Sequence, residues 1–291
     1  ESNCLANSYK KRDLNLPPLL ETAPDGIELK AGLIGCGGRG TGAAINFLDA
    51  GNGLTITALG DVFQDRVDNC RERIKIQKGI DVPQENCFVG FDAFEKVIDS
   101  GVDVVILACP PKFREKHFAA AVKARKHVFM EKPIAVDPAG VRSVISTAKM
   151  ADSLGLKIVT GTHKRHEKSF VELLKRVNDN AIGEIISANI YFNMQQLWYR
   201  NRDAKWTEME WMIRDWVNWC WLSGDHIVEQ HVHNIDIANW FFGKHPVRAL
   251  GFGSRQKRVT GDQYDNFSID YTFDDGRQMH SMSRQINGTD G

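Results

Sequence analysis

No excess of either charge is present in this chain of 291 residues, where 37 lysines and arginines face 37 aspartates and glutamates. Nucleic acids and anionic membranes attract basic surfaces, so the balanced charge gives no reason to expect either as a partner. Long apolar runs are missing too, since no stretch reaches the roughly 18 residues that a membrane-spanning helix needs. The hydrophobic content of 42% and the charged content of 25% are typical of a globular protein.

Cysteine is sparse and carries no recognisable pairing pattern. The absence of C-x-x-C spacing argues against a zinc ribbon and against a disulfide framework, so we expect mostly unreactive thiols. The first residues also lack the basic-then-apolar pattern of a signal peptide, but the chain starts at Glu1, so a processed start remains open and we predict no compartment. The six cysteines are Cys4, Cys36, Cys70, Cys87, Cys109 and Cys220.

What the sequence does contain is a glycine-rich turn with the spacing G-x-G-x-x-G at residues 35–40. It follows an apolar segment, 29–34, and precedes a segment with helical apolar spacing, which is the strand–turn–helix setting of a dinucleotide site. Gly35 would allow the tight turn, Gly37 the approach of a pyrophosphate, and Gly40 the close packing of helix on strand. The phosphates would lie at the helix N-terminus, although such turns also occur as plain loops.

Asp61 strengthens this interpretation. It stands 21 positions after Gly40, at the end of a second apolar run, 54–60. A carboxylate there accepts hydrogen bonds from the adenosine ribose and repels a 2′-phosphate, so NAD is favoured over NADP. The alternative is a solvated aspartate at a strand end.

Strand and helix patterns then alternate as far as residue 161, which predicts a doubly wound parallel sheet of the Rossmann type. The run 102–108 is continuously apolar, as in a strand buried on both faces. We expect an N-terminal arm at 1–26, rich in proline, and a dinucleotide-binding domain at 27–161. The further expected elements are helices at 115–125 and 138–154 and strands at 127–131 and 157–160.

From residue 162 to 291 the pattern changes to alternating apolar and polar residues, first in 186–194 and again in 267–273. This period of two predicts strands with one buried face. Asp274-Asp275-Gly276 then supplies a hairpin turn. We therefore expect a second, α+β domain with an open, mostly antiparallel sheet, which would carry the substrate site.

Two further segments suggest catalysis. Glu131-Lys132-Pro133 ends a parallel strand, at the edge where ligands bind in open α/β sheets, although a solvated lysine is the simpler reading. In the segment 224–236, Glu229 and His233 are four residues apart and would share one helix face, with His226 a turn earlier. An imidazole beside an orienting carboxylate is an acid–base pair, whereas His231 would point elsewhere.

Together these motifs resemble the Gfo/Idh/MocA family of oxidoreductases. The resemblance covers nearly everything from residue 29 onward: the glycine loop, Ala108-Cys109-Pro110-Pro111, the E-K-P motif and the histidine segment. It implies that Lys132, Glu229 and His233 act on the carbinol of a sugar or polyol, and that the chain forms homo-oligomers through its open sheet. The cofactor-binding residues it implies are Gly35, Gly37, Gly38, Arg39, Gly40, Asp61, Cys109, Pro110, Glu131 and Lys132.

The substrate wall is less sharply defined. Arg165 and His166 follow the last strand of the first domain, and Trp219 and His226 flank the start of the histidine segment. Other aromatic residues before that segment suit a sugar ring, although core packing is the usual role of a single tryptophan. These are Trp198, Tyr199, Trp206 and Trp216.

Two departures from the family pattern matter. The usual D-x-G-x-H is here Glu229-Gln-His-Val-His233, which places extra polar bulk near the site, and the chain stops at Gly291 where relatives continue with more sheet. Three alternatives stay open. The first is a glycoside hydrolase or lyase that oxidises its substrate transiently with retained NAD. The second is a metal site at Glu229, His226 and His233, although we expect no metal. The third is a non-catalytic NAD-binding sensor.

Overall fold

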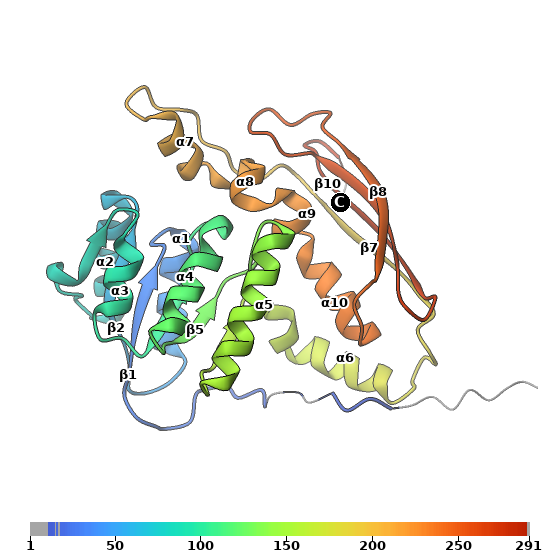
Figure 1. Ribbon diagram of the computed structural model, residues 1–291, viewed down its shortest axis with the longest axis horizontal. Helices are drawn as coiled ribbons and strands as arrows, with labels where there is room; N and C mark the ends of the chain where they lie inside the picture. The colour runs from blue at the N-terminus through green and yellow to red at the C-terminus, as the bar shows by residue number, and fades with distance from the viewer. Residues whose placement is uncertain (1–10, 15, 17, 290–291) are drawn as a thin grey trace, which may run out of the picture.

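Two β-sheets, one in each half of the chain, organise the structure (Figure 1). The computed structural model describes residues 11–14, 16 and 18–289. Cys4 and the parts of the expected N-terminal arm at 1–10, 15 and 17 lie outside the described residues. Within the described part of the chain, no helix is long and apolar enough to cross a membrane.

The first sheet has six parallel strands in the order β3-β2-β1-β4-β5-β6. This order reverses direction between β1 and β4, which confirms the predicted Rossmann architecture and places a ligand-binding crevice at the carboxyl ends of these strands. The strands are β1 (Leu29–Ile34), β2 (Leu54–Asp61), β3 (Cys87–Val89), β4 (Val104–Leu107), β5 (His127–Met130) and β6 (Ile158–Thr160).

Helices cover both faces of this sheet, so its central strands are mostly apolar. Leu33 of β1 and Ile106 of β4 pack on one side, whereas Ile34 and Leu107 pack on the other, and all four are buried. The helices are α1 (Gly38–Asp49), α2 (Gln64–Lys78), α3 (Ala93–Asp99), α4 (Pro111–Lys123) and α5 (Pro138–Ser153), with a 3-10 turn, η1, at Gln84–Asn86.

The main difference from the predicted elements of this half is the start of α4. The sequence predicts a helix from residue 115, but α4 begins at Pro111. Proline fits the first helical position because its fixed φ is helical and its missing N–H would have no partner there. The short β3 and α3 were not predicted, since three residues of strand carry too little periodicity.

The second sheet has four strands in the order β7-β10-β9-β8. β10 pairs with β7 in parallel, and the other two pairings are antiparallel, as the sequence predicts for a mostly antiparallel sheet. Gly276, with φ of 83°, closes the predicted hairpin between β9 and β10. The strands are β7 (Ser187–Met194), β8 (Arg248–Ser254), β9 (Asn266–Thr272) and β10 (Gln278–Gln285).

In the part of the chain that the structure describes, helices pack on only one face of this sheet (Figure 1). Phe242 stacks on Phe273 at a centroid distance of 4.5 Å and, with Met279, forms a small core. The outer face is open, and Leu250 and Phe252 are 66% and 72% exposed on it. The helices of this half are α6 (Lys168–Asn178), α7 (Glu208–Arg214), α8 (Cys220–Ser223), α9 (Asp225–Glu229) and α10 (Val232–Phe242), with 3-10 turns η2 (His163–His166) and η3 (Trp216–Asn218).

The single helix expected to carry Glu229 and His233 is in fact two, and this corrects the prediction. α9 ends at Glu229 and α10 starts at Val232. The amide of His231 donates to the carbonyl of His226, five residues back, at 3.1 Å. This wider turn lets both histidines reach β10, where Ser283 and Ser281 lie two positions apart on one face.

Candidate active site

The glycine loop has the geometry that a dinucleotide requires. Gly35 has φ of 99°, and a Cβ there would overlap the backbone of Cys109. A Cβ at Gly40 would overlap the carbonyl oxygen of Gly35, so both positions need glycine. A Cβ at Gly38 would meet nothing within 4 Å. The loop therefore packs closely against the backbone at Gly35 and Gly40, and it is open at Gly38, where a pyrophosphate would lie.

Asp61 ties the end of β2 to this loop. Its Oδ2 accepts a hydrogen bond of 2.7 Å from the amide of Cys36, and its Oδ1 accepts one of 3.0 Å from the amide of Phe63. Burial raises the pKa of Asp61, while these amides and the nearby Arg66 act in the opposite direction. The carboxyl group thus faces the loop and keeps lone pairs for a ribose hydroxyl.

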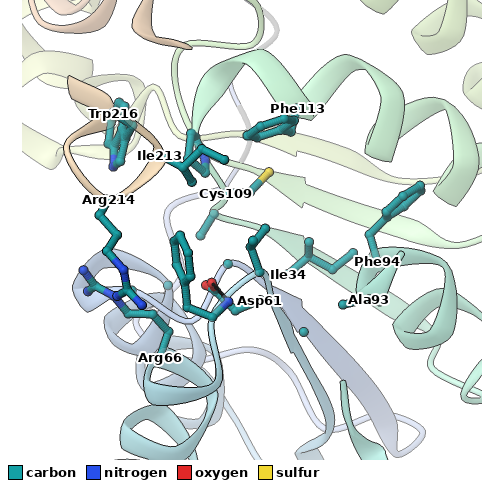
Figure 2. Close-up of a pocket in the computed structure, with 18 of the residues that line it drawn as sticks. Ile34, Asp61, Arg66, Ala93, Phe94, Cys109, Phe113, Ile213, Arg214 and Trp216 are labelled. Carbon is teal, nitrogen blue, oxygen red and sulfur yellow. Dashed lines mark hydrogen bonds between the residues drawn. The ribbon is translucent and has the colours of Figure 1, made fainter. Parts of the chain in front are cut away.

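A cavity of about 630 Å³ opens above the loop (Figure 2). Eight of the expected cofactor-binding residues line it, from Gly35 to Gly40 in the loop and including Asp61, Cys109 and Pro110. Burial raises the pKa of the Cys109 thiol to about 11, so the thiol stays protonated. Aromatic rings that the sequence analysis did not single out complete the apolar side of the cavity: Phe63, Phe91, Phe94 and Phe113.

Glu131 and Lys132, the other two expected cofactor residues, do not line this cavity. Arg39 connects them to it, because its Nε donates to Oε1 of the buried Glu131 at 2.6 Å. Arg39 itself lies on the cavity wall. The cavity and Lys132, the predicted catalytic lysine, are therefore adjacent, with the Arg39–Glu131 ion pair between them.

Lys132 and Glu229 meet across the two halves of the chain. The Lys132 Nζ donates to Oε1 of Glu229 at 2.7 Å and to its carbonyl oxygen at 2.6 Å. The two side chains are only 16% and 6% exposed. The side-chain amide of Gln230 donates to the second carboxylate oxygen. An ammonium held in this way has a fixed direction and still has a proton available for a substrate oxygen.

His233, in the first turn of α10, completes the group. Burial, followed by the charges of Lys132 and His163, lowers its pKa to about 4. Its ring meets that of His163 edge-on at a centroid distance of 4.8 Å. The imidazole is therefore neutral near pH 7 and able to accept a proton, whereas the neighbouring lysine is a donor.

The remaining histidines of the segment serve the packing. His226 is 1% exposed, and its ring nitrogens lie 3.2 Å from the Tyr264 carbonyl and 3.2 Å from the Ser283 hydroxyl. His231 lies 2.7 Å from the Ser281 hydroxyl. The structure gives His226 no free nitrogen for the substrate contact that the sequence suggested. In the described part of the chain, no three His, Cys, Asp or Glu side chains gather as a metal site would require.

The other expected substrate residues are spread out. Arg165 makes two hydrogen bonds, of 2.9 and 2.8 Å, to the carboxylate of Asp236, one turn after His233. His166 is exposed at the end of the same 3-10 turn, η2. Trp219 packs edge-on against Trp211 at 5.2 Å. Of these, Arg165 lies in η2 and is tied through Asp236 to α10, the helix that carries His233, while Trp219 belongs to a separate aromatic group.

Two contributions to the site were not predicted from the sequence. One is Asp236, whose position three residues after His233 is the signal that could have identified it. The other is the segment 198–216, which we expected to form a substrate wall. Its residues line the nucleotide cavity instead: Trp198, Arg200, Ile213, Arg214 and Trp216.

Comparison with known proteins agrees with this geometry. Residues 29–160 match the family model described as an oxidoreductase family with an NAD-binding Rossmann fold, and residues 170–289 match the GFO/IDH/MocA C-terminal domain. The chain is 26% identical over 226 residues to myo-inositol 2-dehydrogenase of Thermotoga maritima, covering 78% of this chain and 58% of that protein. It is 26% identical over 239 residues to inositol 2-dehydrogenase of Acidothermus cellulolyticus, covering 81% and 60%.

Solved structures share the fold. Aldose-aldose oxidoreductase from Caulobacter crescentus superposes with a TM-score of 0.69 at 20% identity, covering 89% of this chain and 72% of that one. Myo-inositol 2-dehydrogenase from Lactobacillus plantarum gives 0.68 at 21% identity, covering 90% and 71%. The chain thus spans about 60% of the length of the curated relatives it matches.

Proposed function

Since this chain belongs to the Gfo/Idh/MocA oxidoreductase family, we propose that it oxidises a secondary alcohol of a sugar, a polyol or a related compound, with NAD as the hydride acceptor. The observation that carries the proposal is the pairing of Lys132 with Glu229 beside a neutral His233, next to the nucleotide cavity. Lys132 as a donor and His233 as a proton acceptor lie close together, which suits the oxidation of a carbinol.

The cofactor assignment rests on the loop and on Asp61. The glycine loop leaves open space above Gly38, and the first turn of α1 presents its amides there. A hydroxyl group of the ribose would donate a hydrogen bond to the carboxylate of Asp61. The negative charge of this carboxylate disfavours a 2′-phosphate. We therefore prefer NAD to NADP. The same arrangement makes Gly35, Gly37, Gly38, Arg39, Gly40, Asp61, Cys109 and Pro110 the binding residues.

The bound nicotinamide would accept the hydride from the carbinol carbon. His233 would take the hydroxyl proton as the C–H bond breaks, and the Lys132 ammonium would donate a hydrogen bond to the same oxygen as it becomes a carbonyl. Glu229 would hold Lys132 in place and would not touch the substrate. Fixing the reacting atoms in this way supplies much of the acceleration expected of such a site.

The substrate class follows from the relatives. Those with the printed names inositol 2-dehydrogenase and myo-inositol 2-dehydrogenase suggest cyclic polyols as the first compounds to try. Arg165 on the Asp236 side of the site would then donate to a substrate hydroxyl. The alternative of elimination with retained NAD would need further acid–base groups, but His226 and His231 are held by Ser283 and Ser281 and supply none.

We also propose that the chain forms a homo-oligomer. The outer face of the second sheet exposes Tyr191, Leu250, Phe252 and Met282, which is more apolar surface than a lone sheet face usually leaves in water. Sedimentation of the wild type and of Phe252→Glu would test this. A wild-type monomer at micromolar concentration would contradict it.

The function is tested by two measurements on the same preparation. The protein is first denatured and the released NAD(H) is quantified by mass spectrometry, which separates a retained from an exchangeable cofactor. Cyclic polyols and sugars are then screened for NADH formation at 340 nm. NAD-dependent turnover that is absent from Lys132→Ala supports the proposal. NAD binding without turnover of any compound would favour a sensor.

A further inference from the structure

The nucleotide cavity has a wall that comes from the second half of the chain. Ile213 and Trp216 lie across the cavity from Asp61 (Figure 2), and Trp198 also lines the cavity. Figure 1 shows α7 reaching over the carboxyl edge of the first sheet, above α2 and α3. No residue of β5 or β6 lines this cavity. It therefore lies on the adenosine side of the sheet rather than on the side of Lys132.

Arg214 fastens this wall to the first domain. Its guanidinium makes hydrogen bonds of 2.9 and 3.1 Å to the two carboxylate oxygens of Asp65, in the first turn of α2. It also lies 3.8 Å from the ring centroid of Phe63 and 3.1 Å from Glu210. The Arg214 side chain is only 12% exposed, whereas that of Asp65 is 54% exposed, so the guanidinium is shielded and the carboxylate still meets water. A two-pronged, partly buried arginine pair of this kind is strong and directional.

Two further guanidinium groups face the glycine loop beneath this wall. Arg66 Nη1 lies 3.9 Å from the position of a Cβ on Gly37. Arg200 lines the same cavity as Arg66, Gly37 and Gly38, and burial, followed by the charge of Arg66, lowers the pKa of Arg200. The carboxylate of Asp65 is already bound by Arg214. Arg66 and Arg200 therefore form a cationic pair beside the loop, which suits the phosphates of a dinucleotide.

We propose that residues 198–216 clamp the adenosine diphosphate half of the cofactor, with Arg214 on Asp65 and Phe63 as the fastening and Arg66 and Arg200 on the phosphates. The clamp rests on the proposed function, because it takes the ligand to be a nicotinamide dinucleotide. The cofactor leaves this site only when the Arg214–Asp65 contact opens. Arg214 is a positioning residue, since it acts through Asp65 and Phe63.

The test compares the dissociation of three nucleotides from the wild type, Arg214→Ala and Asp65→Asn. NAD and ADP contain the adenosine half, whereas nicotinamide mononucleotide lacks it. Lys244→Ala is the matched control, because Lys244 pairs with Asp274 on the surface, far from the cavity. In both cavity variants we expect dissociation of NAD and ADP to accelerate by about tenfold or more, with binding of the mononucleotide unchanged.

The outcomes separate the two proposals. Dissociation of NAD at the wild-type rate in both cavity variants would overturn the clamp and leave the proposed function standing. An equal loss of mononucleotide binding would show a general structural effect and would also overturn it. A wild type that binds neither NAD nor ADP would overturn the clamp together with the proposed function. Wild-type rates in Lys244→Ala, with faster release in the other two, support the clamp.

Discussion

Lys132 and Glu229 form an ion pair of 2.7 Å although they stand 97 positions apart in the chain. The pair joins the end of β5 to the end of α9, so it fixes the first half of the protein against the second at the proposed catalytic point. The charge of Lys132 also contributes to the low pKa of His233. Lys132 thus has a structural role, in its ion pair with Glu229, and a proposed catalytic role at the substrate oxygen.

The ion pair should be visible in stability. Lys132→Met leaves the buried carboxylate of Glu229 without its cation, and we expect this to lower the free energy of unfolding by about 3 kcal/mol. Glu229→Gln in the same chain removes the isolated charge, so the double variant should recover much of the loss. Urea unfolding of the four proteins measures this coupling. Additive effects of the two substitutions would show that the pair contributes nothing.

Lys132 should also matter for turnover. Lys132→Ala is expected to lower kcat on the best polyol by about 100-fold or more, because the developing carbonyl oxygen loses its hydrogen-bond donor. NAD affinity should change little, since Lys132 does not line the nucleotide cavity. Lys244→Ala again serves as the control. A variant with wild-type kcat would exclude the proposed role.

The acid limb of activity should fall well below the usual histidine range. His233 has a pKa of about 4, lowered mainly by burial, so it stays neutral and able to accept a proton down to about that pH. We expect kcat/KM to be level from pH 8 to about pH 5 and to fall as the pH approaches 4. A pH series with the wild type and His233→Asn measures this. An acid limb centred near 6.5 would contradict the assignment.

Stability should decline over the same acidic range. Burial lowers the pKa of His117, His231 and His233 to about 4, from 6.5 in an unfolded chain. The unfolded state therefore binds more protons between pH 6.5 and 4, so stability is complete above 6.5 and is lost as the pH falls through this window. Urea unfolding at pH 7, 6 and 5 should show it. His117→Leu should reduce the slope by about one proton, and an unchanged slope would refute this contribution.

The glycine loop offers a matched pair of substitutions. A Cβ at Gly40 would overlap the Gly35 carbonyl, whereas one at Gly38 meets nothing. Gly40→Ala should lower the free energy of unfolding by about 2 kcal/mol or more and abolish NAD binding. Gly38→Ala should keep stability within about 0.5 kcal/mol and weaken only NAD binding, because its methyl group enters the phosphate space. Calorimetry with and without NAD distinguishes the two.

Local patterns of the sequence determined much of the fold. The G-x-G-x-x-G spacing, Asp61 and the alternation of strands with helices predicted the Rossmann sheet, since each depends on residues close together in the chain. The same holds for the alternating strands 186–194 and 267–273 and the turn at Gly276 between β9 and β10. Backbone geometry and side-chain period are local properties, and so a single sequence records them.

The tertiary structure decided the rest. The break between α9 and α10 lets His226 and His231 both reach serines of β10, a strand about 50 residues further on. Arg214 fastens to Asp65 across 149 positions, and this turns the tryptophan-rich segment expected against the substrate into a wall of the nucleotide cavity. Such contacts depend on how whole elements pack, and no spacing within one segment encodes which distant side chain will meet it.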